Sequence, residues 1–131
     1  MLRSGTIINP QLLSMLAGLG HGQVLVIADA GLPIGRDQRL IDLSLVPGLP
    51  SFADVATAVL DCAVFEACYL AVESADCTAV ADVLAKRLGE IEVRSVTHEE
   101  FKIISARADA VIRTGECTPF ANVALIAGTD F

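Results

Sequence analysis

The two histidines of the chain both stand in polar segments that could handle protons on a ligand. His21 lies between Gly20 and Gly22, and His98 directly follows Thr97. An imidazole is the side chain best suited to give and take protons near neutral pH. We therefore expect proton transfer on a hydroxylated ligand. The opening of an aldose ring is a reaction of this kind, because it needs a proton on the ring oxygen and the loss of one from the anomeric hydroxyl.

A carboxylate and an amide are available to hold the other hydroxyl groups of such a ligand. Asp29 follows an apolar run, and a third polar segment extends from Thr114 to Pro119 and on to Asn122. Each residue also has a structural interpretation. Asp29 can bond its own backbone in a turn, Glu116 can pair with an arginine, and Asn122 can satisfy a buried carbonyl. His21 can stabilise the end of a helix, and His98 can be a solvated residue at a helix start.

The sequence lacks the motifs of metal-dependent and dinucleotide-dependent chemistry. The segment from His98 to Lys102 has lysine where a zincin helix needs its second histidine, and Gly18 to Gly22 precedes a strand instead of following one. The four cysteines are spaced by 6, 9 and 40 residues, unlike a zinc site, and we expect Cys62 and Cys68 to be small buried side chains. We expect a site with no metal and no cofactor.

Composition excludes further classes of protein. The net charge is −7, and no basic run carries interleaved aromatic residues, so nucleic acid is not an expected partner. The first residues lack the apolar core of a signal peptide, and no apolar run reaches the ~18 residues of a membrane span. We expect a cytoplasmic protein that does not bind membranes.

The apolar content predicts both a core and a contact surface. Hydrophobic residues make up 53% of the 131 positions and charged residues 19%, which excludes a disordered chain. The length suits one domain, residues 1–131. Because large exposed apolar patches usually mark interfaces, we expect part of the apolar surplus to be buried between copies of the chain.

Periodicity and capping residues predict the elements that position these side chains. Asn9-Pro10, Ser51 and Thr97 are predicted to start helices, and a further helix is predicted from Cys77 to Leu88. Strands are predicted at residues 24–28, 39–45, 63–72, 91–96, 110–113 and 123–127. Alternating strands and helices favour an α/β fold, a three-layer sandwich with a mixed or parallel central sheet flanked by helices. Ligands bind at the carboxyl ends of strands in such sheets, and we expect all three polar segments there.

With these residues in view, the chain resembles the ribose pyranase and fucose mutarotase family nearly from end to end. The residues that carry the resemblance are Gly5-Thr-Ile-Ile-Asn9, Leu19-Gly-His21, Val26-Ile-Ala-Asp-Ala-Gly-Leu-Pro33, Ile41-Asp-Leu43, Pro50-Ser-Phe52, Val96-Thr-His-Glu-Glu-Phe-Lys102, Ala110-Val-Ile-Arg-Thr-Gly-Glu-Cys-Thr-Pro119 and Phe120-Ala-Asn122. The resemblance implies interconversion of the pyranose and furanose forms of free D-ribose, without a metal or organic cofactor.

The resemblance also implies a role for individual residues. His21 matches the family's proton donor, and Asp29 and His98 match its substrate-binding aspartate and histidine. Phe120, Ala121 and Asn122 match a sugar-binding Tyr-Ala-Asn segment, in which Phe120 lacks the hydroxyl. If that hydroxyl bonds the sugar in relatives, this chain loses about 1 kcal/mol of binding.

The resemblance further implies an assembly and a metabolic neighbour. Family members form homo-oligomeric rings, decamers or pentamers, with sites at contacts between subunits, and they supply furanose to ribokinase. Three alternatives stay open at this point. The first is a mutarotase for L-fucose or another monosaccharide, although that branch has Ala-Asn-Phe-Pro where this chain has Ala30-Gly-Leu-Pro33. The second is a sugar-binding or regulatory subunit without turnover, and the third is an assembly module.

Overall fold

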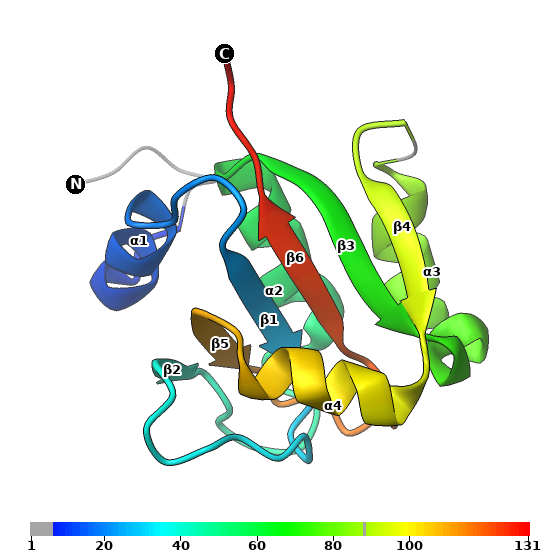
Figure 1. Ribbon diagram of the computed structural model, residues 1–131. Helices are drawn as coiled ribbons and strands as arrows, with labels where there is room; N and C mark the ends of the chain where they lie inside the picture. Colours follow the sequence, from blue (N-terminus) through cyan, green and yellow to red (C-terminus); the bar gives the residue numbers. More distant parts are fainter. Residues whose placement is uncertain (1–6, 88) are drawn as a thin grey trace.

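A six-stranded mixed sheet forms the centre of the computed structural model, which describes residues 7–87 and 89–131 (Figure 1). The strands are β1 Val24–Ala28, β2 Leu40–Asp42, β3 Phe65–Ala71, β4 Glu92–Val96, β5 Ala110–Arg113 and β6 Val123–Ala127, in the order β2-β5-β1-β6-β3-β4. β6 runs antiparallel to both its neighbours, β1 and β3, whereas the other pairs are parallel. The predicted α/β class is confirmed, and the sheet is mixed.

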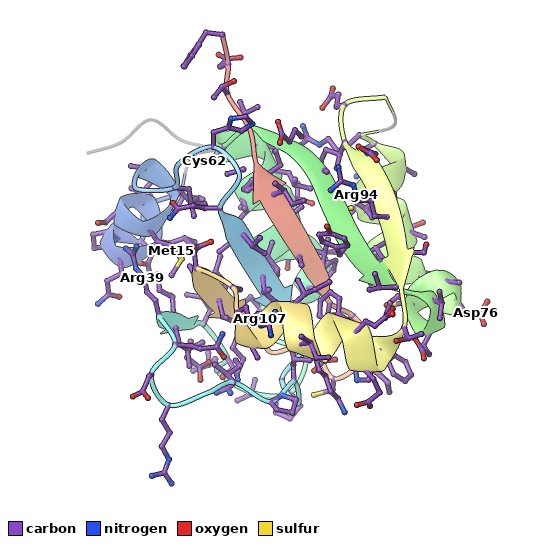
Figure 2. The ribbon with its side chains drawn as sticks, viewed as in Figure 1. Met15, Arg39, Cys62, Asp76, Arg94 and Arg107 are labelled. Carbon is purple, nitrogen blue, oxygen red and sulfur yellow. The ribbon has the colours of Figure 1, made fainter. Side chains whose placement is uncertain are left out.

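Helices cover both faces of this sheet. They are α1 Pro10–Ala17, α2 Phe52–Cys62, α3 Thr78–Ala85 and α4 His98–Ala106, with a 3₁₀ helix, η1, at Val72–Asp76. Figure 1 shows α2 and α3 behind the sheet and α4 in front of it. α1 contributes Met15, which is fully buried between this helix and the sheet, to the core shared with α2 and α3 (Figure 2). Phe101 of α4 is fully buried in the second core, on the opposite face.

The predicted helix starts are confirmed by their capping hydrogen bonds. Asn9 Oδ1 accepts from the amide of Leu12 at 3.0 Å, and Ser51 Oγ accepts from the amide of Asp54 at 3.1 Å. At α4, Thr97 and Glu100 bond each other's main chain, so that both donors of a capping box are satisfied. This box fixes where α4 begins and therefore where His98, its first residue, is placed.

Three local predictions need correction. The strand predicted over residues 39–45 is observed only at Leu40–Asp42. The strand predicted over residues 63–72 is shorter, because Val72 already belongs to η1, which the periodicity did not indicate. Cys62 is exposed at the end of α2 instead of buried (Figure 2). Cys68 is buried as predicted, and burial raises the pKa of its thiol to about 11. Gly5 and Leu88, at the predicted first motif and helix end, lie outside the described residues.

Candidate functional site

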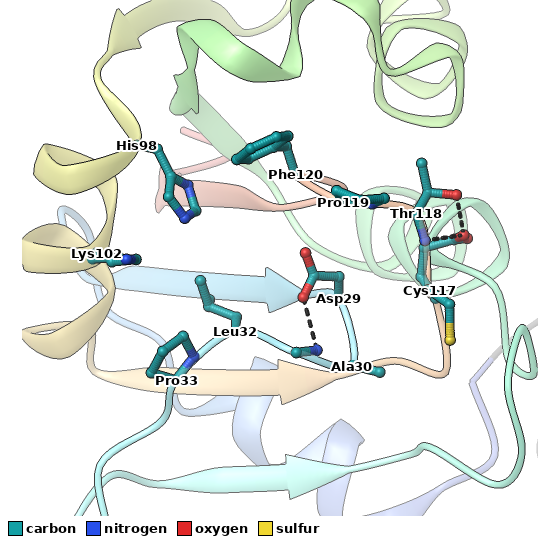
Figure 3. Close-up of a pocket in the computed structure, with 12 residues that line it drawn as sticks. Asp29, Ala30, Leu32, Pro33, His98, Lys102, Cys117, Thr118, Pro119 and Phe120 are labelled. Carbon is teal, nitrogen blue, oxygen red and sulfur yellow. Dashed lines mark hydrogen bonds between the residues drawn. The ribbon is translucent and has the colours of Figure 1, made fainter.

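Strand direction brings distant polar segments together at one end of the sheet. Asp29 follows β1, His98 follows β4, and the segment from Thr114 follows β5, at the carboxyl ends of parallel strands. Because β6 is antiparallel, its first residues lie at this same end. The result is a hollow of about 630 Å³, within the ~300–1,000 Å³ usual for small-molecule sites (Figure 3). It is lined by Asp29, Ala30, Gly31, Leu32, Pro33, His98, Lys102, Glu116, Cys117, Thr118, Pro119 and Phe120.

Asp29 is held in place by a reciprocal pair of hydrogen bonds with Asn122. The Asp29 amide donates to Asn122 Oδ1 at 2.7 Å, and Asn122 Nδ2 donates to Asp29 Oδ2 at 2.9 Å. Asp29 Oδ1 also accepts from the amide of Gly31 at 2.9 Å, the turn bond expected from the sequence. Asn122 is buried, so it fixes the carboxylate from behind. The remaining lone pairs of the Asp29 carboxylate can accept hydrogen bonds from hydroxyl groups in the hollow.

Glu116 lies in the loop that forms one side of the hollow, and it accepts hydrogen bonds from two neighbouring segments. Its carboxylate accepts from the amide of Phe52, the first residue of α2, at 3.1 Å, and from the amide and hydroxyl of Thr118 at 3.2 and 2.8 Å. Its main-chain oxygen accepts from the amide of Ala30 at 2.8 Å. Glu116 therefore bonds main-chain donors and a hydroxyl, not the arginine that the sequence offered as one interpretation.

These hydrogen bonds perturb the pKa of Glu116. Partial burial acts to raise it, but the bonds from Thr118, Phe52 and Cys117 outweigh burial and hold the pKa of this carboxyl below its usual range. Next to it, Gly115 packs so closely on the backbone of Leu49 that a Cβ there would collide with the Leu49 carbonyl. This side of the hollow is therefore fixed by the close contact of Gly115 with the backbone of Leu49 and by the hydrogen bonds of the Glu116 carboxylate within its own loop.

His98 and Phe120 form the side of the hollow opposite Leu32 (Figure 3). Their rings meet edge to face, with centroids 4.9 Å apart and an interplanar angle of 85°. Phe120 has a φ of 64°, a left-handed conformation unusual for a large side chain. Ser74 of η1 holds it there, because the Ser74 hydroxyl donates to the Phe120 carbonyl at 2.7 Å. His98 Nδ1 is buried without a hydrogen-bond partner among the described residues.

His21 lies at the opposite end of the sheet from this hollow. It precedes β1, whereas Asp29 follows β1, and a five-residue strand spans about 16 Å. The exposed His21 ring bonds Glu66 at 3.0 Å and lines a separate hollow of about 350 Å³. The expectation that all three polar segments meet at the carboxyl ends of the strands is therefore wrong for His21 within one chain. The prediction failed because residues 20–22 precede β1 and lie at its amino end, whereas the other two segments follow their strands.

The other predicted site residues fall into three positions. Asp29, His98 and Phe120 line the hollow, Asn122 supports Asp29 from the interior, and Ala121 is fully buried in the core. Residues 116–119, which belong to the third polar segment expected at this edge, also line the hollow. Sequence reasoning missed Leu32, Pro33 and Lys102, which have no signal of their own and line the hollow because the turn after β1 and the start of α4 meet there. The roles assigned to His21, Asp29, His98, Phe120, Ala121 and Asn122 stay predictions.

Two further observations concern groups that the site could hold. Within residues 7–87 and 89–131, no three His, Cys, Asp or Glu side chains are gathered in a way that could hold a metal ion. None of the described helices is both long and apolar enough to cross a membrane. The residues that line the hollow include the carboxylates of Asp29 and Glu116, the imidazole of His98, the amine of Lys102 and apolar side chains, a combination that can bind a small polyhydroxylated molecule.

Fold and hollow together define an α/β sandwich with a small-molecule site at the carboxyl ends of its strands. Residues 2–130 match the RbsD / FucU transport protein family, and the chain belongs to this family. D-ribose pyranase of Symbiobacterium thermophilum is 48% identical over 99% of this chain and 100% of its own. D-ribose pyranase of Geobacillus kaustophilus is 47% identical over 100% of this chain and 96% of its own.

Solved structures show the same fold. RbsD of Bacillus subtilis, complexed with D-ribose, is 44% identical, covers 99% of this chain and 100% of its own, and has a TM-score of 0.90. The fucose mutarotase of Streptococcus pneumoniae, in complex with L-fucose, covers 95% of both chains with a TM-score of 0.75. At 22% identity, this second likeness concerns the fold alone.

The lowered pKa of Glu116 generates a prediction about stability. A carboxyl whose folded pKa lies below its ordinary value of 4.5 adds stability that is present above that pH and lost as the pH falls through the folded pKa. We expect Glu116→Gln to lower the free energy of unfolding by about 1–2 kcal/mol at pH 7, since charged acceptors are lost. The difference from the parent chain should shrink below pH 4.5.

Urea unfolding followed by circular dichroism across pH 3–7 measures this difference. Glu73→Gln, at an exposed glutamate of η1, is the matched control and should leave the stability nearly unchanged at every pH. A Glu116→Gln deficit that persists undiminished at pH 3 would contradict the assignment.

Proposed function

We propose that this chain is a D-ribose pyranase, an intramolecular isomerase that interconverts the pyranose and furanose forms of free D-ribose. The observation that carries the proposal is the hollow in which the fixed Asp29 carboxylate lies across from His98 and Phe120. Its volume, its one open carboxylate and its apolar walls suit a small neutral sugar. RbsD of Bacillus subtilis, which is 44% identical over 99% of this chain, is complexed with D-ribose.

The reaction needs proton transfers but no redox step. The anomeric hydroxyl loses its proton, the bond from C1 to the ring oxygen breaks, and that oxygen gains a proton, which gives the open aldehyde. The O4 hydroxyl then attacks C1 and loses its proton while the aldehyde oxygen gains one to become the new anomeric hydroxyl, which forms the furanose. An imidazole can supply and remove these protons, because its ordinary pKa lies near neutrality. We assign this role to His21.

The remaining assigned residues bind and orient the sugar. Asp29 accepts hydroxyl hydrogens, with Asn122 fixing the carboxylate, and the ring of His98, which lines the hollow, bonds a sugar hydroxyl. Phe120 presents its ring to the C–H face of the sugar, and Ala121 holds the backbone between Phe120 and Asn122 in the core. No metal or cofactor has a part in this mechanism.

The position of His21 requires a second copy of the chain. Its end of the sheet and the hollow are different surfaces, and we propose that the contact that joins them runs head to tail. Head-to-tail contacts that close generate rings. We infer that the active form is a homo-oligomeric ring, a pentamer or a decamer of two rings, in which His21 of one subunit serves the hollow of the next.

Exposed apolar side chains at both ends of the sheet support such a contact. Val64 and Phe131 line the hollow beside His21, and both are exposed in the single chain. Near the sugar hollow, Leu45, Val46 and Leu49 are exposed on the loop that packs against Gly115. Burying both sets between subunits uses the apolar surplus of the sequence.

The proposed product places the reaction before a kinase that takes furanose. Ribokinase is the expected consumer, and a cytoplasmic location is the expectation that goes with it. Neither the free sugar nor the assembly requires nucleic acid or a membrane.

Saturation-transfer NMR on D-ribose tests the proposed activity. We expect the protein to accelerate pyranose–furanose exchange, and His21→Ala to remove most of the acceleration while ribose still binds. Unchanged exchange at high protein concentration, with binding seen by calorimetry, would favour a sugar-binding subunit without turnover. Failure to bind any aldose would favour an assembly module, and acceleration with L-fucose but not with D-ribose would favour the other branch of the family.

Mixing two inactive variants tests the shared site. His21→Ala and Asp29→Asn chains, dissociated and reassembled at equal amounts, should form some contacts in which His21 of one chain meets Asp29 of the other. Random assembly in a head-to-tail ring makes about a quarter of the contacts competent, so we expect about a quarter of the parent exchange rate. The double variant His21→Ala/Asp29→Asn mixed with His21→Ala is the control and should stay inactive. If the first mixture also stays inactive although mass spectrometry finds both chains in one assembly, the site is not shared.

Phe120 generates a prediction about affinity. We expect Phe120→Tyr to restore a hydroxyl that bonds the sugar and to lower the dissociation constant for ribose about fivefold, equivalent to ~1 kcal/mol. Isothermal titration calorimetry measures the constant. Phe120→Leu is the control, which removes the ring without adding a hydroxyl and should weaken binding. An unchanged dissociation constant for Phe120→Tyr would show that ribose forms no hydrogen bond with a hydroxyl at residue 120.

A further inference from the structure

An irregularity in β3 places one glutamate beside His21. Phe65 pairs with Ala127 of β6, and Ala67 pairs with Ile126, which is the immediate neighbour of Ala127. Glu66 is therefore an additional residue in β3, the signature of a β-bulge. Bulges disrupt the ladder locally and turn a side chain in a new direction, and they occur often beside active sites.

The core confirms that the bulge changes the direction of side chains. Phe65 and Cys68, three residues apart, both belong to the core on the α2 side of the sheet. In a regular strand, residues three apart point to opposite faces. Beyond the bulge the alternation is regular, because Tyr69 and Ala71 contact the core on the α4 side. The one additional residue thus keeps both neighbours buried while Glu66 itself is exposed.

The exposed carboxylate of Glu66 bonds the imidazole of His21. Glu66 Oε2 lies 3.0 Å from His21 Nε2. A carboxylate oxygen only accepts, so the hydrogen in this bond is carried by Nε2. This leaves the other ring nitrogen, Nδ1, to exchange a proton with a ligand.

The backbone around this pair is closely fixed. The Gly22 amide donates to the Ala127 carbonyl at 2.9 Å, which ties the loop of His21 to the end of β6 (Figure 1). The Gly128 amide donates to the Val64 carbonyl at 2.9 Å, on the other side of the bulge. A Cβ at Gly128 would lie 3.3 Å from both Cβ and N of Glu66. The end of β6 therefore passes so close to Glu66 that only a glycine fits there without displacement.

We infer that Glu66 is a positioning residue for His21: its carboxylate, aimed by the bulge, holds the proton of the imidazole on Nε2 and turns Nδ1 toward the sugar of the neighbouring subunit. This inference rests on the proposed function. The His21 and Glu66 side chains are 60% and 50% exposed, and ion pairs this exposed add little to folding stability. A contribution to folding stability therefore does not explain the bulge in β3. A role in orienting the acid/base group His21 does explain it.

Glu66→Ala and Glu66→Gln test the inference with two measurements. We expect Glu66→Ala to slow ribose exchange at saturating sugar about 10- to 100-fold, since a misplaced catalytic group costs this much, with the affinity for ribose unchanged within about twofold. Glu66→Gln keeps an acceptor oxygen of the same shape and should recover part of the rate. Glu92→Gln, which removes an exposed carboxylate from the neighbouring strand β4, is the control for lost charge and should leave the rate unchanged.

The second measurement reports on the pair without needing activity. The chain has two histidines, so ¹⁵N NMR of the imidazoles is assigned with the His21→Ala variant alone. We expect His21 to show the Nε2-protonated tautomer in the parent chain and in Glu66→Gln, and a mixture of tautomers in Glu66→Ala.

The outcomes separate the two proposals. If the parent chain does not accelerate ribose exchange, the proposed function fails, and the positioning role fails with it. If the parent chain is active but Glu66→Ala keeps its full rate, or if its tautomer does not change, only the role of Glu66 is overturned. If ribose affinity falls in proportion to the rate, Glu66 supports the assembly or the binding of sugar, and positioning is again excluded.

Discussion

Two hydrogen bonds between Asp29 and Asn122 join the end of β1 to the start of β6, and the site depends on them. They can form only because β6 runs against its neighbours, so that its first residues reach the edge where β1 ends. The same reversal brings the end of β6 beside the start of β3, where Glu66 meets His21. A single antiparallel strand in an otherwise parallel sheet thus brings polar side chains together at both ends of the sheet.

The secondary structure could be predicted largely from local signals. Asn9, Ser51 and Thr97 marked helix starts because their side chains bond exposed helical amides, a property of a few neighbouring residues. The direction of β6 could not be predicted in this way. A strand buried on both faces has the same continuous apolar pattern whichever way it runs. The bulge at Glu66 was also invisible, since one additional residue does not change the composition of a strand.

The candidate site was predictable where it follows from strand ends. Asp29 stands directly after β1 and His98 two residues after β4, and the carboxyl ends of parallel strands share an edge. His21 was misplaced because a polar segment beside a strand does not show by itself which end of the sheet it joins. Glu116 was recognised as polar, but its partners are main-chain amides and Thr118, which no pattern of side-chain types reveals.

The carboxylate of Glu116 has a consequence for which sugars enter the hollow. Its oxygens already accept three hydrogen bonds from the protein, so it contributes negative charge to the hollow with little remaining capacity to bond a ligand. Asp29 adds a second acidic group, and the amine of Lys102 lies 3.1 Å from Glu99. A phosphate ester carries up to two negative charges at neutral pH, whereas a free aldose carries none. The charges that line the hollow therefore suit a neutral sugar better than a phosphorylated one.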